Sequence, residues 1–132
     1  MRVRIALVML VVLTGSIVFA VAQTGSPVSY ARDVEPIFLA ECSDCHSADK
    51  PKKGLDLSAG KGQGNLVDRP SQEVKEILLV KAGNAAGSYL WAKLNHTTSE
   101  GKGMPRTMFG SKKLPQEQLD LIERWIKDGA QP

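Results

Sequence analysis

Both cysteines of the chain and one of its two histidines lie within five residues, in the stretch CSDCH from Cys42 to His46. Two thiols three positions apart are about one helical turn apart, so they can add across the two vinyl groups of a haem. The imidazole of His46 then follows directly and is placed to bind the iron as the proximal ligand. Because Cys-x-x-Cys-His is the attachment signature of c-type haem, we expect one haem bound covalently through Cys42 and Cys45.

The alternatives to haem attachment fit the motif less well. A thioredoxin-like redox pair needs a βαβ setting, which the pattern of the chain does not show. A zinc site would use Cys42, Cys45, His46 and His96, but adjacent Cys45 and His46 poorly match the usual spacing of paired zinc ligands. A disulfide across two residues would close a tiny loop and stabilise little. For random placement, the odds of the pattern are on the order of a few in ten thousand.

Three side chains are candidates for the sixth iron ligand. Met104 lies in a glycine-flanked loop, GKGMPR, and the following Pro105 biases its backbone towards an extended conformation. Met108 stands beside Phe109 and has the character of a packing residue. His96 lies in a polar loop, where an exposed side chain is the usual outcome. We expect Met104 to be the ligand, with Met108 and His96 as the alternatives.

The first 22 residues have the pattern of an export signal. Arg2 and Arg4 precede an apolar run over residues 5–22, which ends in Ala20-Val21-Ala22, a small-x-small cleavage pattern. We expect residues 1–22 to be a signal peptide and 23–132 to be one mature domain in the periplasm. The alternative is a retained membrane anchor, since the run is just long enough to span a bilayer.

Removing residues 1–22 leaves 15 basic and 14 acidic side chains, a formal net charge of +1. No clustered basic face is evident, so the sequence argues against a nucleic-acid partner. Lys50, Lys52 and Lys53 follow the motif closely, and they can steer an acidic partner protein. A solvated loop accounts for the same three lysines equally well.

The spacing of apolar residues predicts several short helices that position these groups. The first, over 33–41, has Asp33 as N-cap and leads into Cys42; the last, over 115–127, precedes Gly129 as the C-terminal glycine. Between them the pattern predicts helices over 72–81 and over 89–94, the latter capped by Ser88, with loops over 48–68 and 95–113 and a short extended piece at LDL. The predicted fold class is mostly α, with small helices packed around one covalently bound haem.

Beyond the motif, three stretches resemble the small monohaem cytochrome c domains of the planctomycete-type group, within the class I cytochrome c fold. They are DVEPIFLAECSDCHSADKPKKGLDLS, GNAAGSYLWAKL and MPRTMFGSKKLPQEQLDLIERWIKDGA, and the resemblance covers roughly residues 30–130. It implies that the first and last helices cross near one haem edge, with Phe38 and Trp125 as an aromatic pair there. It also implies a methionine ligand before the last helix, a position that Met104 matches. The family usually has Ser or Thr at the start of that helix, where this chain has Pro115.

Further side chains are candidate haem contacts. Phe38, Tyr89 and Trp91 are aromatic candidates, and the polar tips of the last two can hydrogen-bond a haem propionate. Arg106 can pair with a propionate as a charge-assisted contact. Ordinary core or surface packing is the alternative for each of them.

We expect a periplasmic electron carrier rather than an enzyme, its iron cycling between Fe(II) and Fe(III) with His/Met ligation and an unidentified redox partner protein. One alternative is a haem enzyme or gas-binding cytochrome, which needs a displaceable sixth ligand. Another is a haem module that works inside a larger complex.

Overall fold

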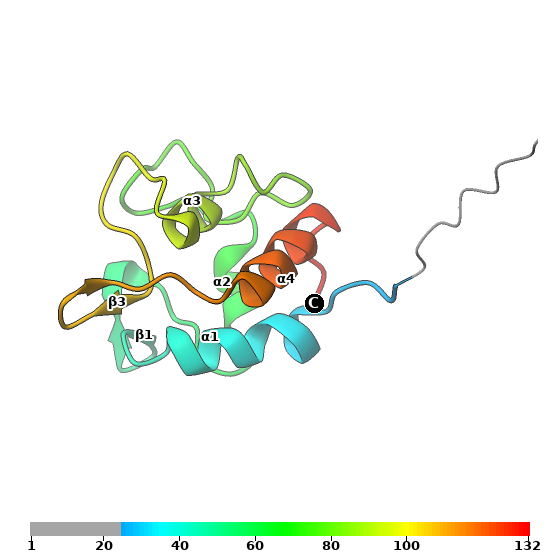
Figure 1. The fold of residues 1–132 in the computed structure, drawn as a ribbon, viewed down its shortest axis with the longest axis horizontal. Coiled ribbons are helices and arrows are strands. Elements are labelled where there is room, and N and C mark those ends of the chain that lie inside the picture. The colour runs from blue at the N-terminus through cyan, green and yellow to red at the C-terminus, as the bar shows by residue number, and fades with distance from the viewer. Residues whose placement is uncertain (1–24) are drawn as a thin grey trace, which may run out of the picture.

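The computed structural model describes residues 25–132 (Figure 1). The predicted signal peptide, residues 1–22, lies outside this part of the chain and stays a prediction. Within the described range, no helix combines the length and apolar character needed to cross a membrane.

The chain enters the fold through a π-helical turn, η1 (Tyr30–Val34), that continues directly into α1 (Glu35–Glu41). Ser29 starts this helical stretch, because its hydroxyl accepts the Arg32 N–H at 3.4 Å while its own N–H donates to the Asp33 carboxylate at 2.9 Å. This reciprocal pair of hydrogen bonds satisfies free backbone and side-chain groups at the helix start. The prediction that Asp33 is the N-cap is therefore wrong: Asp33 lies in the first turn.

The motif follows α1 without a break. The N–H of Cys42 donates to the Phe38 carbonyl at 2.9 Å, and the chain then turns into β1 (His46–Ser47). This strand pairs antiparallel with β2 (Lys50–Pro51), which leads into a 3₁₀ turn, η2 (Lys52–Gly54). α1 and the hairpin therefore hold CSDCH between two regular elements.

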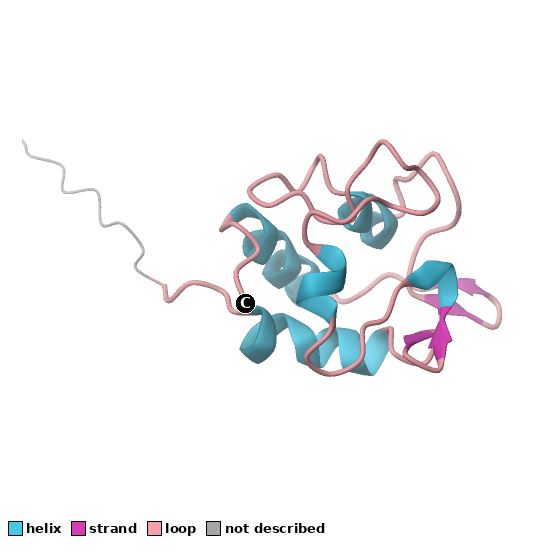
Figure 2. Ribbon diagram, turned by 180° about the vertical axis from the view of Figure 1, so that it is seen from behind, coloured by secondary structure: helices cyan, strands magenta, loops and turns pink. Residues whose placement is uncertain are grey.

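A second two-stranded hairpin is formed by β3 (Arg106–Thr107) and β4 (Gly110–Ser111). Both hairpins lie at the same end of the molecule, away from the C-terminal turn of the last helix (Figures 1 and 2). The loop predicted over 95–113 is thus partly a hairpin.

The middle of the chain contains α2 (Gly62–Leu66) and α3 (Tyr89–Asn95), and α3 confirms the helix predicted over 89–94. The helix predicted over 72–81 is wrong. Its C-terminal part pairs instead with the segment after α2, through the bridges Val67 to Val80 and Pro70 to Leu78. These backbone hydrogen bonds join distant residues, so tertiary pairing overrides local helix propensity here.

The last helix, α4 (Gln116–Lys127), confirms the clearest prediction from the sequence. Pro115 takes the N-cap position without a capping side-chain hydrogen bond, and Gly129 has a φ of 99° just after the helix, as a C-terminal glycine should. α4 packs against η1 and buries four apolar side chains: Leu119, Ile122, Trp125 and Ile126.

The aromatic side chains at this contact differ from the expected pair. Tyr30 lies between Phe38 and Trp125, with ring centroids 6.0 Å from the former and 5.3 Å from the latter. The predicted aromatic contact is therefore a cluster of three, and η1 supplies its centre. The described residues form four α-helices and two small sheets joined by long loops, and their arrangement around a haem stays a prediction.

Candidate functional site

A cleft of about 460 Å³ opens beside the motif, with a volume in the range of small-molecule and cofactor sites. Cys42, Cys45 and His46 line it from the side of α1 and β1, and Met104 lines it from the loop before β3. Much of the remaining wall is apolar and comes from distant segments: Leu55, Leu57, Leu79, Leu90, Leu94 and Pro105. The fold thus places sulfur and imidazole groups around one largely apolar hollow.

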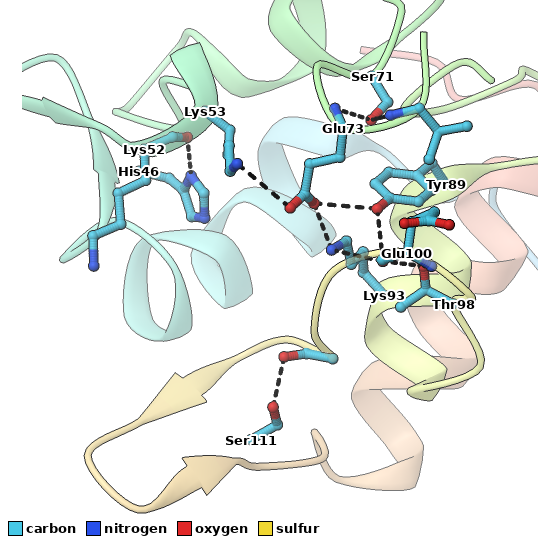
Figure 3. A network of polar contacts seen from close by, with 12 residues as sticks. His46, Lys52, Lys53, Ser71, Glu73, Tyr89, Lys93, Thr98, Glu100 and Ser111 are labelled. Atoms are coloured by element: carbon cyan, nitrogen blue, oxygen red, sulfur yellow. Dashed lines mark hydrogen bonds and ion pairs between the residues drawn. The ribbon is translucent and has the colours of Figure 1, made fainter. Parts of the chain in front are cut away.

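The His46 ring is held by a hydrogen bond to the main chain. Its Nδ1 lies 3.1 Å from the Lys52 carbonyl oxygen, as Figure 3 shows. A carbonyl only accepts, so Nδ1 carries the proton and Nε2 keeps its lone pair. Burial lowers the pKa of His46, which favours the neutral ring. The side chain is therefore an oriented, neutral imidazole, the form that binds a metal.

The two cysteines are both free thiols and both half-buried. The N–H groups of Cys45 and His46 donate to the Cys42 carbonyl at 3.1 and 3.0 Å, so one tight turn positions all three side chains. Burial, helped by the Glu41 charge and by Cys45, raises the pKa of the Cys42 thiol to about 12. At neutral pH this group is a protonated thiol rather than a thiolate.

The structure gives the zinc alternative no support. Within residues 25–132, no group of three or more His, Cys, Asp and Glu side chains could hold a metal ion. His96, which the zinc site would need, does not line the cleft.

The end of α3 fixes the backbone of Met104 on both sides. Its N–H donates to the Lys93 carbonyl at 2.9 Å, and its carbonyl lies 3.0 Å from Nε2 of His96. A side chain at Gly103 would place its Cβ 2.5 Å from the His96 ring, so only glycine allows this close approach. The Met104 side chain is half-buried beside the core, at the edge of the cleft.

The three candidates for the sixth ligand have separate positions. Met104 lines the cleft, whereas Met108 is 91% exposed in the turn between β3 and β4. His96 is exposed at the C-terminal end of α3, where its φ of 60° is left-handed. The role that the structure gives His96 is the hydrogen bond to Met104, a contact that the sequence did not signal.

The candidate haem contacts divide in the same way. Tyr89 and Arg106 line the cleft, and Arg106 also donates to the Ser111 hydroxyl at 3.1 Å. Phe38 is fully buried in the core, and Trp91 is partly buried against it, and neither lines the cleft. Of the three lysines after the motif, Lys52 and Lys53 line the cleft and Lys50 does not.

A charged cluster in the cleft was missed by the sequence analysis (Figure 3). Lys93 is only 5% exposed, and its ammonium lies 2.5 Å from the Glu73 carboxylate, with Lys53 at 3.7 Å on the other oxygen. The Tyr89 hydroxyl donates to the same carboxylate at 3.1 Å. The hydrogen bond from Lys93 lowers the pKa of Glu73. Burial opposes the charge on Lys93, but its hydrogen bonds to Glu73 and Tyr89 outweigh it and raise its pKa.

This cluster gives the apolar cleft one polar side, where a single carboxylate joins η2 to α3. The sequence offers no signal for it, because its members are far apart along the chain. The incorrect prediction of a helix over 72–81 also assigned Glu73 to the wrong element.

Comparison with known proteins gives a likeness in fold alone. No protein-family model matches the sequence, and no curated protein matches it. Among solved structures, a chain of Kuenenia stuttgartiensis hydrazine synthase is similar, with a TM-score of 0.55 and 21% sequence identity. The match covers 78% of this chain and 16% of that one, so this chain spans about a sixth of its length.

Proposed function

We propose that this protein is a small monohaem c-type cytochrome that carries electrons in the periplasm, and that His46 and Met104 would hold the haem iron. The proposal rests on one observation. A single cleft is lined by Cys42, Cys45 and His46 and also by Met104, which lies far from the other three along the chain. Two thiols, an imidazole and a thioether are the donor set of a His/Met haem c. The class I cytochrome c fold is part of the proposal.

The residues of the cleft fit this group chemically. The thiols are free, the imidazole is neutral and oriented by Lys52, and the surrounding leucines are apolar. Haem bound here would supply one-electron chemistry between Fe(II) and Fe(III). Apolar walls exclude water, and a thioether ligand raises the reduction potential, so the chain's own residues tune the potential upwards.

The protein's contribution to electron transfer is a fixed ligand geometry. His46 is tied to the main chain at Lys52, and the Met104 backbone is tied to α3 at both its N–H and its carbonyl. Because these hydrogen bonds hold both ligands, the ligands need to move little when the haem gains or loses an electron. This property suits a carrier better than a catalyst that must open a site for substrate.

A second candidate is a haem module that serves a larger enzyme. The observation that favours it is the similar fold within a chain of hydrazine synthase, of which the match covers only 16%. In that case the same ligands would relay electrons within an assembly rather than between freely diffusing proteins.

The absorption spectrum of protein made in a periplasm with haem-maturation machinery tests the proposal. We expect a low-spin haem c spectrum in both redox states, with the weak near-infrared sulfur-to-iron band in the ferric protein. We also expect that the ferrous protein binds carbon monoxide only slowly. Protein without haem would contradict the proposal, and rapid binding of carbon monoxide would favour an enzyme or a gas-binding cytochrome.

A further inference from the structure

The tip of the β3–β4 hairpin exposes two large apolar side chains. Met108 is 91% and Phe109 96% exposed, whereas the other exposed large hydrophobics of residues 25–132, Leu39 and Ile77, reach 37% and 38%. The pairing of Thr107 with Gly110 leaves Met108 and Phe109 as the two turn residues. Two-residue turns favour Asn, Asp and Gly, so neither apolar side chain helps this turn to form.

The hairpin belongs to the basic part of an otherwise acidic domain. Residues 101–113 carry four basic side chains and no acidic one, whereas the other residues of 25–132 carry 11 basic and 14 acidic ones. The segment thus has a formal charge of +4 against −3 for the remainder. The Lys112 ammonium pairs with the Glu41 carboxylate of α1 at 2.7 Å. This ion pair neutralises one charge of the segment and links it to the end of α1 that leads into the motif. Such a charge distribution orients the domain in the field of an acidic surface.

The hairpin also adjoins the cleft. Arg106, its first residue, lines the cleft and lies two positions before Met108. The Ser111 hydroxyl donates to the Gly103 carbonyl at 2.8 Å, and this bond fixes the base of the hairpin to the loop that carries Met104 (Figure 3). A protein that covers the tip would therefore stand beside the mouth of the cleft.

We propose that the β3–β4 hairpin is the docking site of an acidic partner protein. Met108 and Phe109 enter an apolar hollow of the partner. The basic side chains of residues 101–113 that are not paired with Glu41 bind its carboxylates: Lys102, Arg106 and Lys113. An apolar centre within a charged rim is the usual anatomy of such a contact. The docking itself does not require haem, whereas its use for electron delivery to the cleft rests on the proposed function.

A protein partner fits these features better than a lipid surface. Two side chains bury little hydrocarbon, and stable membrane attachment needs a larger apolar area or a second anchor. Because the hairpin lies beside the cleft, a protein docked there could exchange electrons with the cleft, which a membrane could not. An anionic bilayer is nevertheless a clear alternative outcome of the test.

The test uses the purified haem-loaded protein, labelled with ¹⁵N, and an acidic flavodoxin as the probe at low ionic strength. We expect amide shifts concentrated in residues 104–113. The double variant Met108→Ser/Phe109→Ser should weaken binding about tenfold, the loss typical of removing an apolar anchor. Ile77→Ser, which removes an exposed apolar side chain elsewhere, should leave the affinity unchanged.

Shifts centred on another face, or equal affinity of the double variant and the native chain, would overturn the proposal. So would a double variant that loses binding to phosphatidylglycerol vesicles but keeps its affinity for flavodoxin, since the hairpin would then be a membrane contact. Reduction by reduced flavodoxin, followed in the same samples, separates the two proposals. Binding at the hairpin without reduction would contradict the carrier function alone, and fast reduction that the double variant leaves unchanged would contradict the docking site alone.

Discussion

The two walls of the cleft are built in different ways. The motif wall is local: one turn holds Cys45 and His46 to the Cys42 carbonyl, and the His46 ring bonds to Lys52, six residues further on. The methionine wall depends on another element, because Met104 is held by Lys93 and His96 at the end of α3. Spacing in the sequence is therefore enough to build the first wall, whereas the second exists only when α3 and its loop are in place.

This difference has a consequence for how each wall should respond to substitution. Loss of a motif side chain removes a chemical group that nothing else in the cleft replaces. Loss of a contact behind Met104 leaves the sulfur present but less firmly positioned. The comparison therefore predicts that substitutions in the motif affect the haem site most, that substitution of Met104 has an intermediate effect, and that substitution of the residues that hydrogen-bond its backbone has a smaller one.

The largest effect is expected from removing both thiols. In Cys42→Ala/Cys45→Ala, no thioether bond can form, so acid–acetone should extract essentially all the haem, whereas the native protein should retain it. Absorbance of the extracted protein measures the retained fraction. Ser43→Ala, within the same turn, is the control and should keep its haem. Covalent haem in the double variant would mean that the motif wall is not the attachment site.

The next effect concerns the choice between the two loop methionines. Met104→Ala should abolish the near-infrared band of the ferric protein and lower the midpoint potential by on the order of 0.1 V, within the roughly 0.8 V that axial ligands span. Met108→Ala should change neither, because that side chain is 91% exposed at the hairpin tip. If the band survives in Met104→Ala and disappears in Met108→Ala, the loop must rearrange around the haem.

A smaller effect is expected from the hydrogen bond behind the methionine. Removing a hydrogen bond costs about 1 kcal/mol, so His96→Ala should shift the protein about fivefold towards the form without the sulfur ligand. The intensity of the near-infrared band measures this shift, and His96→Gln should recover part of the intensity that His96→Ala loses. Thr97→Ala, the neighbouring substitution, is the control. A complete change of the spectrum in His96→Ala would instead indicate that His96 is the sixth ligand, and Met104 would then not be the ligand on that side of the cleft.

Glu73 tests the contribution of the charged cluster to stability. Since the pKa of Glu73 is lowered in the folded state, its contribution is complete above the unfolded value, about 4.3, and disappears as pH falls through the folded value. Glu73→Gln should lower the free energy of unfolding by roughly 1–3 kcal/mol at pH 7, because buried Lys93 loses its counter-charge.

Urea denaturation at several pH values measures the difference between the two proteins. We expect the difference to begin to narrow as pH falls below the unfolded value, about 4.3, and to vanish as pH falls through the lower folded pKa of Glu73. The exposed Glu76 provides the control, and Glu76→Gln should have little effect at any pH. A difference that stays constant down to pH 2 would show that the carboxylate charge is not what stabilises the cluster.

Local signals in the sequence predicted the elements with strong periodicity. The apolar stripe of α4 and its C-terminal glycine identified that helix almost to the residue, and the stretch before Cys42 was correctly helical. The segment 72–81 failed because its backbone pairs with residues 67–70, and no local propensity reports such a partner. Asp33 failed as an N-cap for a subtler reason, since Ser29 four residues earlier offers the chain an equally good start.

The sequence by itself determined which chemical groups this protein can offer. Two thiols and an imidazole in one turn, with three candidates for a further ligand, follow from residue types and spacing, which act over a few bonds. Only the tertiary structure decided that Met104 lines the cleft while Met108 and His96 do not. It also brought Glu73 to Lys53 and Lys93, and it set Met108 and Phe109 in the solvent. Those placements depend on contacts between residues far apart in the chain, whose free energies no local pattern contains.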